Sequence, residues 1–147
     1  MTISTNPASN PSRFLPTWGA RAAIFCWTSG PTPEATIQLE FAERLRGIGK
    51  WPNVNGDSIY GTTYGPLQNL PFGRITAKGN MVYLHVFDWP STASLRLNGL
   101  SSQVSAATVL VLGEKLQFKQ ENSAVTISVP PAAPDPYDTV IRIQVWP

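Results

Sequence analysis

The spacing of apolar residues changes near residue 53, from a helical period to a strand period. Before that point, apolar side chains recur in steps of three and four residues, at Ile37, Phe41, Leu45, Ile48 and Trp51. Such steps place side chains on one face of an α-helix. Because proline cannot continue the backbone hydrogen bonding of a helix, we expect this helix to begin near Thr36 and to end at Pro52.

After residue 53, short segments alternate apolar and polar side chains, as Val125, Ile127 and Val129 do. The segments expected to form strands are 74–76, 81–87, 94–98, 108–112, 116–119, 125–129 and 141–146. A turn at Gly79 and Asn80 is expected to pair the first two as a hairpin. The pattern predicts a mainly β fold, an antiparallel β-sandwich with one face of each strand exposed to solvent and with Leu84, Ile127 and Ile143 in the core.

Charge and composition exclude several kinds of partner. The chain has 11 Lys and Arg against 9 Asp and Glu, a formal net charge of +2, and no run of basic residues. We therefore expect no nucleic-acid partner and no membrane partner, and no apolar run is long enough to span a bilayer. Cys26 and His85 are the single cysteine and histidine. We expect neither an internal disulfide nor a metal site built from cysteines or histidines.

The titratable residues do not form a catalytic pattern. Acid–base catalysis by two carboxylates needs one acid whose pKa is raised by an apolar setting. The nine carboxylates fall on the polar side of the helix, in turns, or at strand ends and loops: Glu34, Glu40, Glu43, Asp57, Asp88, Glu114, Glu121, Asp135 and Asp138. We interpret His85, inside an apolar strand, as a half-buried packing residue. We expect no catalytic residue in this chain.

Aromatic residues offer a second kind of chemistry, stacking on sugar rings. Trp89, Trp146 and Tyr137 are the candidates expected to be more exposed. Trp89 and Tyr137 are the residues we predict for weak glycan binding. The alternative interpretation is that these rings pack in the core or at its edges.

Several segments in succession carry a family resemblance. They are Gly-Pro-Thr-Pro-Glu at 30–34, Glu-Arg-Leu-Arg-Gly-Ile-Gly-Lys-Trp at 43–51, Val-Asn-Gly-Asp-Ser-Ile-Tyr-Gly-Thr at 54–62, Thr-Ala-Lys-Gly-Asn at 76–80, Val-Phe-Asp-Trp-Pro at 86–90 and Ala-Pro-Asp-Pro-Tyr-Asp-Thr-Val-Ile at 133–141. With these segments the chain resembles the C-terminal part of α-L-fucosidases of glycoside hydrolase family 29. The family has a catalytic (β/α)8-like barrel followed by a β-sandwich.

The resemblance implies three stretches. Residues 1–30 are expected to be a disordered or out-of-frame tail, residues 31–52 a remnant of the last barrel loop and helix, and residues 53–147 the C-terminal β-sandwich domain. The fold class is then an antiparallel β-sandwich preceded by one α-helix left over from the barrel. Without its barrel partner, the helix stripe of Ile37, Phe41, Leu45 and Ile48 is expected to favour self-association.

The resemblance also implies an activity for the intact family enzyme, the exo-acting, retaining hydrolysis of terminal α-L-fucosyl linkages in glycans. The partner would be a fucosylated glycan, and no metal or organic cofactor is implied. The nucleophilic aspartate and the acid/base glutamate of the family lie in the barrel, upstream of every matched segment. We therefore expect the chain alone to be catalytically incompetent. The alternative is a non-catalytic module that supports the barrel or weakly binds glycans.

The segment before Gly30 does not match the final barrel strand of the family, which usually reads Gly-Asn-aromatic-Leu-Leu-Asn-Val-Gly-Pro. Read one base earlier, the codons of Phe25, Cys26, Trp27 and Thr28 must give leucine, leucine and aspartate. Our hypothesis is a one-base insertion near the codons of Ser29 and Gly30. Intact family members are commonly exported or lysosomal, but no signal peptide is recognised in this chain, so its compartment is left open.

Overall fold

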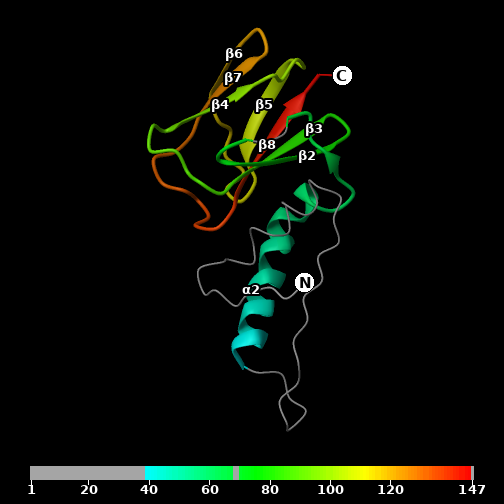
Figure 1. Cartoon of the computed structure of the whole chain (residues 1–147), viewed down its shortest axis with the longest axis vertical. Coiled ribbons are helices and arrows are strands. Elements are labelled where there is room, and N and C mark those ends of the chain that lie inside the picture. The colour runs from blue at the N-terminus through cyan, green and yellow to red at the C-terminus, as the bar shows by residue number, and fades with distance from the viewer. Residues whose placement is uncertain (1–38, 68–69, 147) are drawn as a thin grey trace.

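The computed structural model describes residues 39–67 and 70–146, together forming one helix and two sheets (Figure 1). Helix α2 spans Leu39–Asn55 and continues into a short 3-10 turn, η2, at Gly56–Ser58. The strands that follow are β1 Thr63–Tyr64, β2 Gly73–Lys78, β3 Met81–Val86, β4 Ser94–Asn98, β5 Val104–Val109, β6 Phe118–Glu121, β7 Ala124–Ser128 and β8 Thr139–Val145. The side chains of Glu40, Phe41 and Arg44 lie outside the described set.

The strands form two antiparallel sheets. The larger sheet has the order β1-β2-β3-β8-β5, and the smaller has the order β4-β7-β6. Their facing sides share one apolar core, in which Leu84, Ile127 and Ile143 are fully buried as predicted. The mainly β, antiparallel sandwich expected from the alternating pattern is confirmed. Gly79 adopts a φ of +59° in the predicted turn and joins β2 to β3, which pair from Gly73 opposite Val86 to Lys78 opposite Met81.

Two expectations about strands are wrong. The apolar run at 108–112 is not a strand of its own, because β5 ends at Val109 and the chain reverses there, with the Gly113 amide donating to the Val109 carbonyl at 2.8 Å. The expectation of one solvent-exposed face fails for β3, where every residue from Val82 to Val86 is buried. The second face of β3 is covered by the end of α2.

Helix α2 does not end at Pro52, as predicted, but continues to Asn55. A proline inside a helix removes one backbone hydrogen bond and costs about 3 kcal/mol. Tertiary contacts hold this last turn in place, since Trp51 and Asn55 on either side of Pro52 are buried against the sheet. Packing therefore outweighs the local cost of the proline.

The other half of α2 points away from the sandwich (Figure 1). Leu39 is 70% exposed and Leu45 is 41% exposed, and Ile48 is partly buried. Ile37, the side chain of Phe41 and the predicted tail at 1–30 lie outside the described residues. The apolar stripe is thus visible at Leu45 and Ile48.

Among the described residues, no helix combines the length and apolar character needed to cross a lipid bilayer.

Candidate functional site

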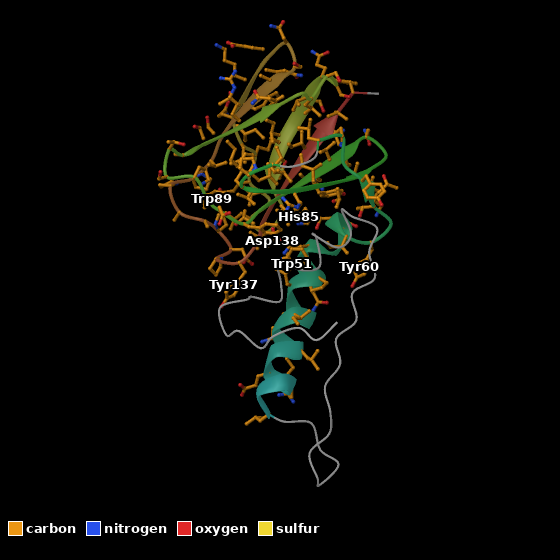
Figure 2. The ribbon with its side chains drawn as sticks, viewed as in Figure 1. Trp51, Tyr60, His85, Trp89, Tyr137 and Asp138 are labelled. Carbon is orange, nitrogen blue, oxygen red and sulfur yellow. The ribbon has the colours of Figure 1, made fainter. Side chains whose placement is uncertain are left out.

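A second, smaller apolar cluster lies on the outer face of the larger sheet. It consists of Trp51 from α2, Tyr83 from β3 and Val140 from β8, with Ile59, Met81 and Leu110 packed around it. These residues come from the helix, from the position after η2, from β3 and β8, and from the position after β5, so the cluster connects the helix to the sandwich. We call the polar group at its centre, Trp51, His85 and Asp138, the helix–sheet joint; the three lie together where α2 meets the sandwich (Figure 2).

The joint contains a fully buried histidine and carboxylate. His85 Nδ1 lies 3.0 Å from Asp138 Oδ2, and neither side chain is exposed to solvent. Because a carboxylate accepts hydrogen bonds, Nδ1 is the donor. Trp51 Nε1 donates to the backbone carbonyl of Asp138 at 3.3 Å, and its ring centroid lies 6.1 Å from that of His85. Trp51 of the helix therefore contacts both His85 on β3 and Asp138 in the loop before β8.

The loop before β8 orients Asp138. Asp135 Oδ1 accepts hydrogen bonds from the backbone amides of Tyr137 at 2.8 Å and Asp138 at 3.1 Å. Thr139 Oγ1 contacts the carbonyl and the amide of Asp135, each at 3.1 Å. Aspartate side chains commonly close turns in this way. The turn fixes the backbone of Asp138, so that its carboxylate faces β3 and its carbonyl faces Trp51.

A chain of hydrogen bonds joins the end of α2 to β2. Asn55 Nδ2 donates to the carbonyl of Trp51 at 3.3 Å, and Ser58 Oγ donates to the carbonyl of Asn55 at 2.6 Å. Thr76 Oγ1 on β2 then donates to the carbonyl of Ser58 at 2.7 Å. All four residues are buried. These bonds satisfy polar groups at the helix end that burial would otherwise leave unpaired.

The joint can position elements but cannot meet a substrate. Both members of the pair have zero exposure, and His85 Nε2 has no hydrogen-bond partner within the described part of the chain. Our interpretation of His85 as half-buried is wrong, because Trp51 covers it. The sequence places Asp138 among the carboxylates at strand ends and loops and does not predict that its side chain is fully buried. A sealed pair of this kind holds a fold together at the contact between α2, β3 and β8.

The other carboxylates described in residues 39–67 and 70–146 do not converge on a site. Asp57 is exposed and lies 3.7 Å from Lys78 Nζ, and Asp88 is exposed after β3. Within those same residues, no group of three or more His, Cys, Asp or Glu side chains is placed to hold a metal ion. Glu34 lies outside the described residues.

The two residues predicted to bind glycans occupy different environments (Figure 2). Trp89 is partly buried against the main core, and its Nε1 donates to the Pro130 carbonyl at 2.9 Å. Tyr137 is 55% exposed in the loop before β8. Trp146, the third aromatic candidate, is 62% exposed. Glycan binding at Trp89 and Tyr137 stays a prediction.

Sequence reasoning missed the joint, although the matched segments contain two of its three residues, Trp51 and Asp138. Trp51 closes the segment at 43–51, Asn55 and Ser58 lie in the segment at 54–62, and Asp138 lies in the segment at 133–141. The structure brings these three segments together at one place. That these residues lie in the matched segments is a signal present in the sequence. The sequence alone does not show that the segments meet at one end of the helix.

Two packed antiparallel sheets, with one helix bonded to the outer face of the larger sheet, define a β-sandwich domain. Residues 73–144 match the family model of the alpha-L-fucosidase C-terminal domain. The chain belongs to this family and corresponds to the C-terminal part of alpha-L-fucosidases. The resemblance drawn from the sequence is confirmed.

Individual relatives agree with this assignment. The chain is 36% identical over 125 residues to an alpha-L-fucosidase of Branchiostoma floridae, covering 78% of this chain and 28% of the relative. Alpha-L-fucosidase isoenzyme 1 of Paenibacillus thiaminolyticus superposes with a TM-score of 0.83 at 25% identity, covering 95% of this chain and 35% of that one. A GH29 alpha-L-fucosidase of Bacteroides thetaiotaomicron, solved as a trapped covalent intermediate with 2-fluoro-fucosyl fluoride, gives a TM-score of 0.72 at 27% identity over 80% of this chain and 28% of that one. The chain thus spans about a third or less of these relatives.

Proposed function

We propose that the chain is the supporting C-terminal part of a retaining, exo-acting α-L-fucosidase, in which α2 and the sandwich hold a catalytic barrel. The observation that carries this proposal is the contrast between the two ends of α2. Trp51 and Asn55 are buried against the sheet, whereas Leu39 and Leu45 expose apolar surface. A helix that is fixed at one end and exposes apolar side chains at the other is suited to pack against a second domain with its free half.

In this proposal the joint sets the direction of the helix. The bonds from Trp51 to Asp138 and from Asn55 and Ser58 to the helix end fix the last turn of α2 relative to β3 and β8. A barrel that packs on α2 would then be held at a defined angle to the sandwich. The nucleophile and the acid/base residue of retaining hydrolysis would come from the barrel.

The substrate in this proposal is a fucosylated glycan, as the names of the relatives imply. The chain alone is expected not to release nitrophenol from 4-nitrophenyl α-L-fucoside. A chimera tests the supporting role: this chain, from residue 39 onward, replaces the corresponding C-terminal part of the Branchiostoma floridae enzyme. We expect that chimera to hydrolyse the fucoside.

Two variants of the chimera make the test specific. Trp51→Ala removes the buried anchor and is expected to lower the thermal midpoint and the yield of active enzyme. Trp146→Ala removes an exposed ring of the same kind and is expected to leave both near the parent values. Turnover by the isolated chain, or a folded chimera without activity, would overturn the proposal.

A further inference from the structure

The outer face of the smaller sheet forms an open groove that the joint does not use. Its volume is about 500 Å³, within the range of small-ligand sites. The floor is the central strand β7, whose outward side chains are small: Ala124, Thr126 and Ser128. Longer side chains on the two neighbouring strands rise on either side. The groove therefore results from small side chains on β7 between longer side chains on β4 and β6.

The walls carry charge and hydrogen-bonding groups. Arg96 on β4 and Lys119 on β6 are both cross-strand partners of Thr126, so two cations flank one hydroxyl. Lys119 Nζ lies 2.6 Å from Glu121 Oε1, and Arg96 Nε donates to Asn98 Oδ1 at 3.1 Å. The hydrogen bond between Lys119 and Glu121 raises the pKa of the lysine and lowers that of the carboxyl, so both are charged at neutral pH. Arg96, Lys119 and Glu121 together carry a net charge of +1.

From this arrangement we infer that the groove binds an acidic oligosaccharide, with a carboxylate between Arg96 and Lys119 and hydroxyls on Thr126, Ser128 and Gln117. Sugar hydroxyls both donate and accept, which matches side chains of both kinds. An added peptide strand fits less well, because the backbone of β7 already pairs with β4 and β6 along its whole length.

The groove lies where a partner packed on α2 would not cover it. It lies on the smaller sheet, whereas α2 is bonded to the larger one, and β6 and β7 lie at the end of the molecule away from α2 (Figure 1). A partner packed on α2 would leave this sheet open. The inference stands on the groove itself and does not depend on the proposed supporting function.

Titration of the full chain with tetragalacturonate, followed by calorimetry, tests the inference. We expect saturable binding that weakens as salt is added, because the cations are exposed and screened. Arg96→Gln and Lys119→Gln should each weaken binding about tenfold, as loss of a charged hydrogen bond does. Lys78→Gln, which removes an exposed cation outside the groove, should leave it unchanged.

Matched probes separate the alternatives. Maltotetraose has the same length without the carboxylates, tetraglutamate has the carboxylates on a peptide, and sodium sulfate has the charge alone. Binding of tetragalacturonate above all three supports the inference. Equal binding of maltotetraose, tighter binding of tetraglutamate or sulfate, or no binding of tetragalacturonate would overturn it. All four outcomes are independent of fucosidase activity, so they do not bear on the supporting function.

Discussion

His85 and Asp138 are 53 residues apart in the sequence, yet their side chains form a 3.0 Å hydrogen bond with no exposure to solvent. Burying a polar pair is costly unless each group finds a partner. Here His85 comes from β3 and Asp138 from the loop before β8, and Trp51 of α2 covers both. The pair therefore ties three distant segments to one place.

Replacement of Asp138 by alanine should destabilise the chain strongly. It leaves His85 buried without its acceptor, and a buried polar group that loses its hydrogen-bond partner costs about 1–3 kcal/mol. Urea unfolding of the full chain measures the change. Asp57→Ala is the control, because Asp57 is an exposed carboxylate beside Lys78 and a surface pair contributes about 0–1 kcal/mol. Equal, small effects of the two substitutions would show that the buried pair does not stabilise the fold.

Trp51→Ala should also lower the free energy of unfolding, by about 3–5 kcal/mol, because it removes a large buried ring and the bond to Asp138. Trp146→Ala should cost less than about 1 kcal/mol, since most surface substitutions change stability little and Trp146 is 62% exposed. Thermal unfolding of both variants measures the difference. Similar midpoints would mean that the helix is not held through Trp51.

The sequence predicted strands better than it predicted contacts between them. The alternation of Val125, Ile127 and Val129 was sufficient to place β7, because a period of two is a local property. The end of α2 was not predictable from Pro52 alone, because the burial of Trp51 and Asn55 depends on strands that come later in the chain.

The candidate site was still less accessible to sequence reasoning. No spacing rule links His85 to Asp138, and a lone histidine in a strand is equally compatible with a half-buried position. The groove on the smaller sheet depends on small side chains on β7 lying between Arg96 and Lys119. That requires the strand order β4-β7-β6, which alternation does not specify.

Two glycines provide a matched pair of substitutions. A Cβ on Gly73 would lie 1.8 Å from the His85 carbonyl oxygen, a backbone atom that cannot rotate away. Gly73→Ala should therefore force the β2–β3 pair apart and cost at least about 1–3 kcal/mol. A Cβ on Gly47, in α2, meets nothing within 4 Å, so Gly47→Ala should stabilise the helix by about 1 kcal/mol.

Chemical denaturation of these two variants gives the sign of each effect directly. The contradicting result is a Gly73→Ala protein as stable as the parent, which would mean that β2 and β3 do not approach as closely as the register implies.

Stability should fall at alkaline pH through Tyr83. Burial raises the pKa of the Tyr83 hydroxyl above its ordinary value of 10.0; the charge of Asp57 adds to this rise, and Arg142 opposes it. Since the folded-state pKa is above the unfolded one, the folded state keeps its proton longer. This contribution is fully present below about pH 10 and is lost as pH rises through the folded-state pKa.

Thermal midpoints between pH 8 and 11 test this expectation. The parent chain should lose stability above pH 10, and Tyr83→Phe should lose less over the same interval. Tyr60→Phe is the control, because Tyr60 is 64% exposed. Identical curves for the parent and Tyr83→Phe would contradict the prediction.

Self-association should depend on the exposed end of α2. Leu39 and Leu45 are exposed on the half of α2 that points away from the sandwich, and exposed apolar surface promotes association. The double substitution Leu39→Lys and Leu45→Lys should lower the weight-average mass measured by sedimentation velocity, with little change in the unfolding midpoint. Leu112→Lys, in the turn after β5, changes a leucine away from the helix whose exposure lies between those of Leu39 and Leu45, and should leave the mass unchanged. If Leu112→Lys reduces association as much as the double substitution, then apolar exposure in general, and not this end of α2, causes the chain to associate.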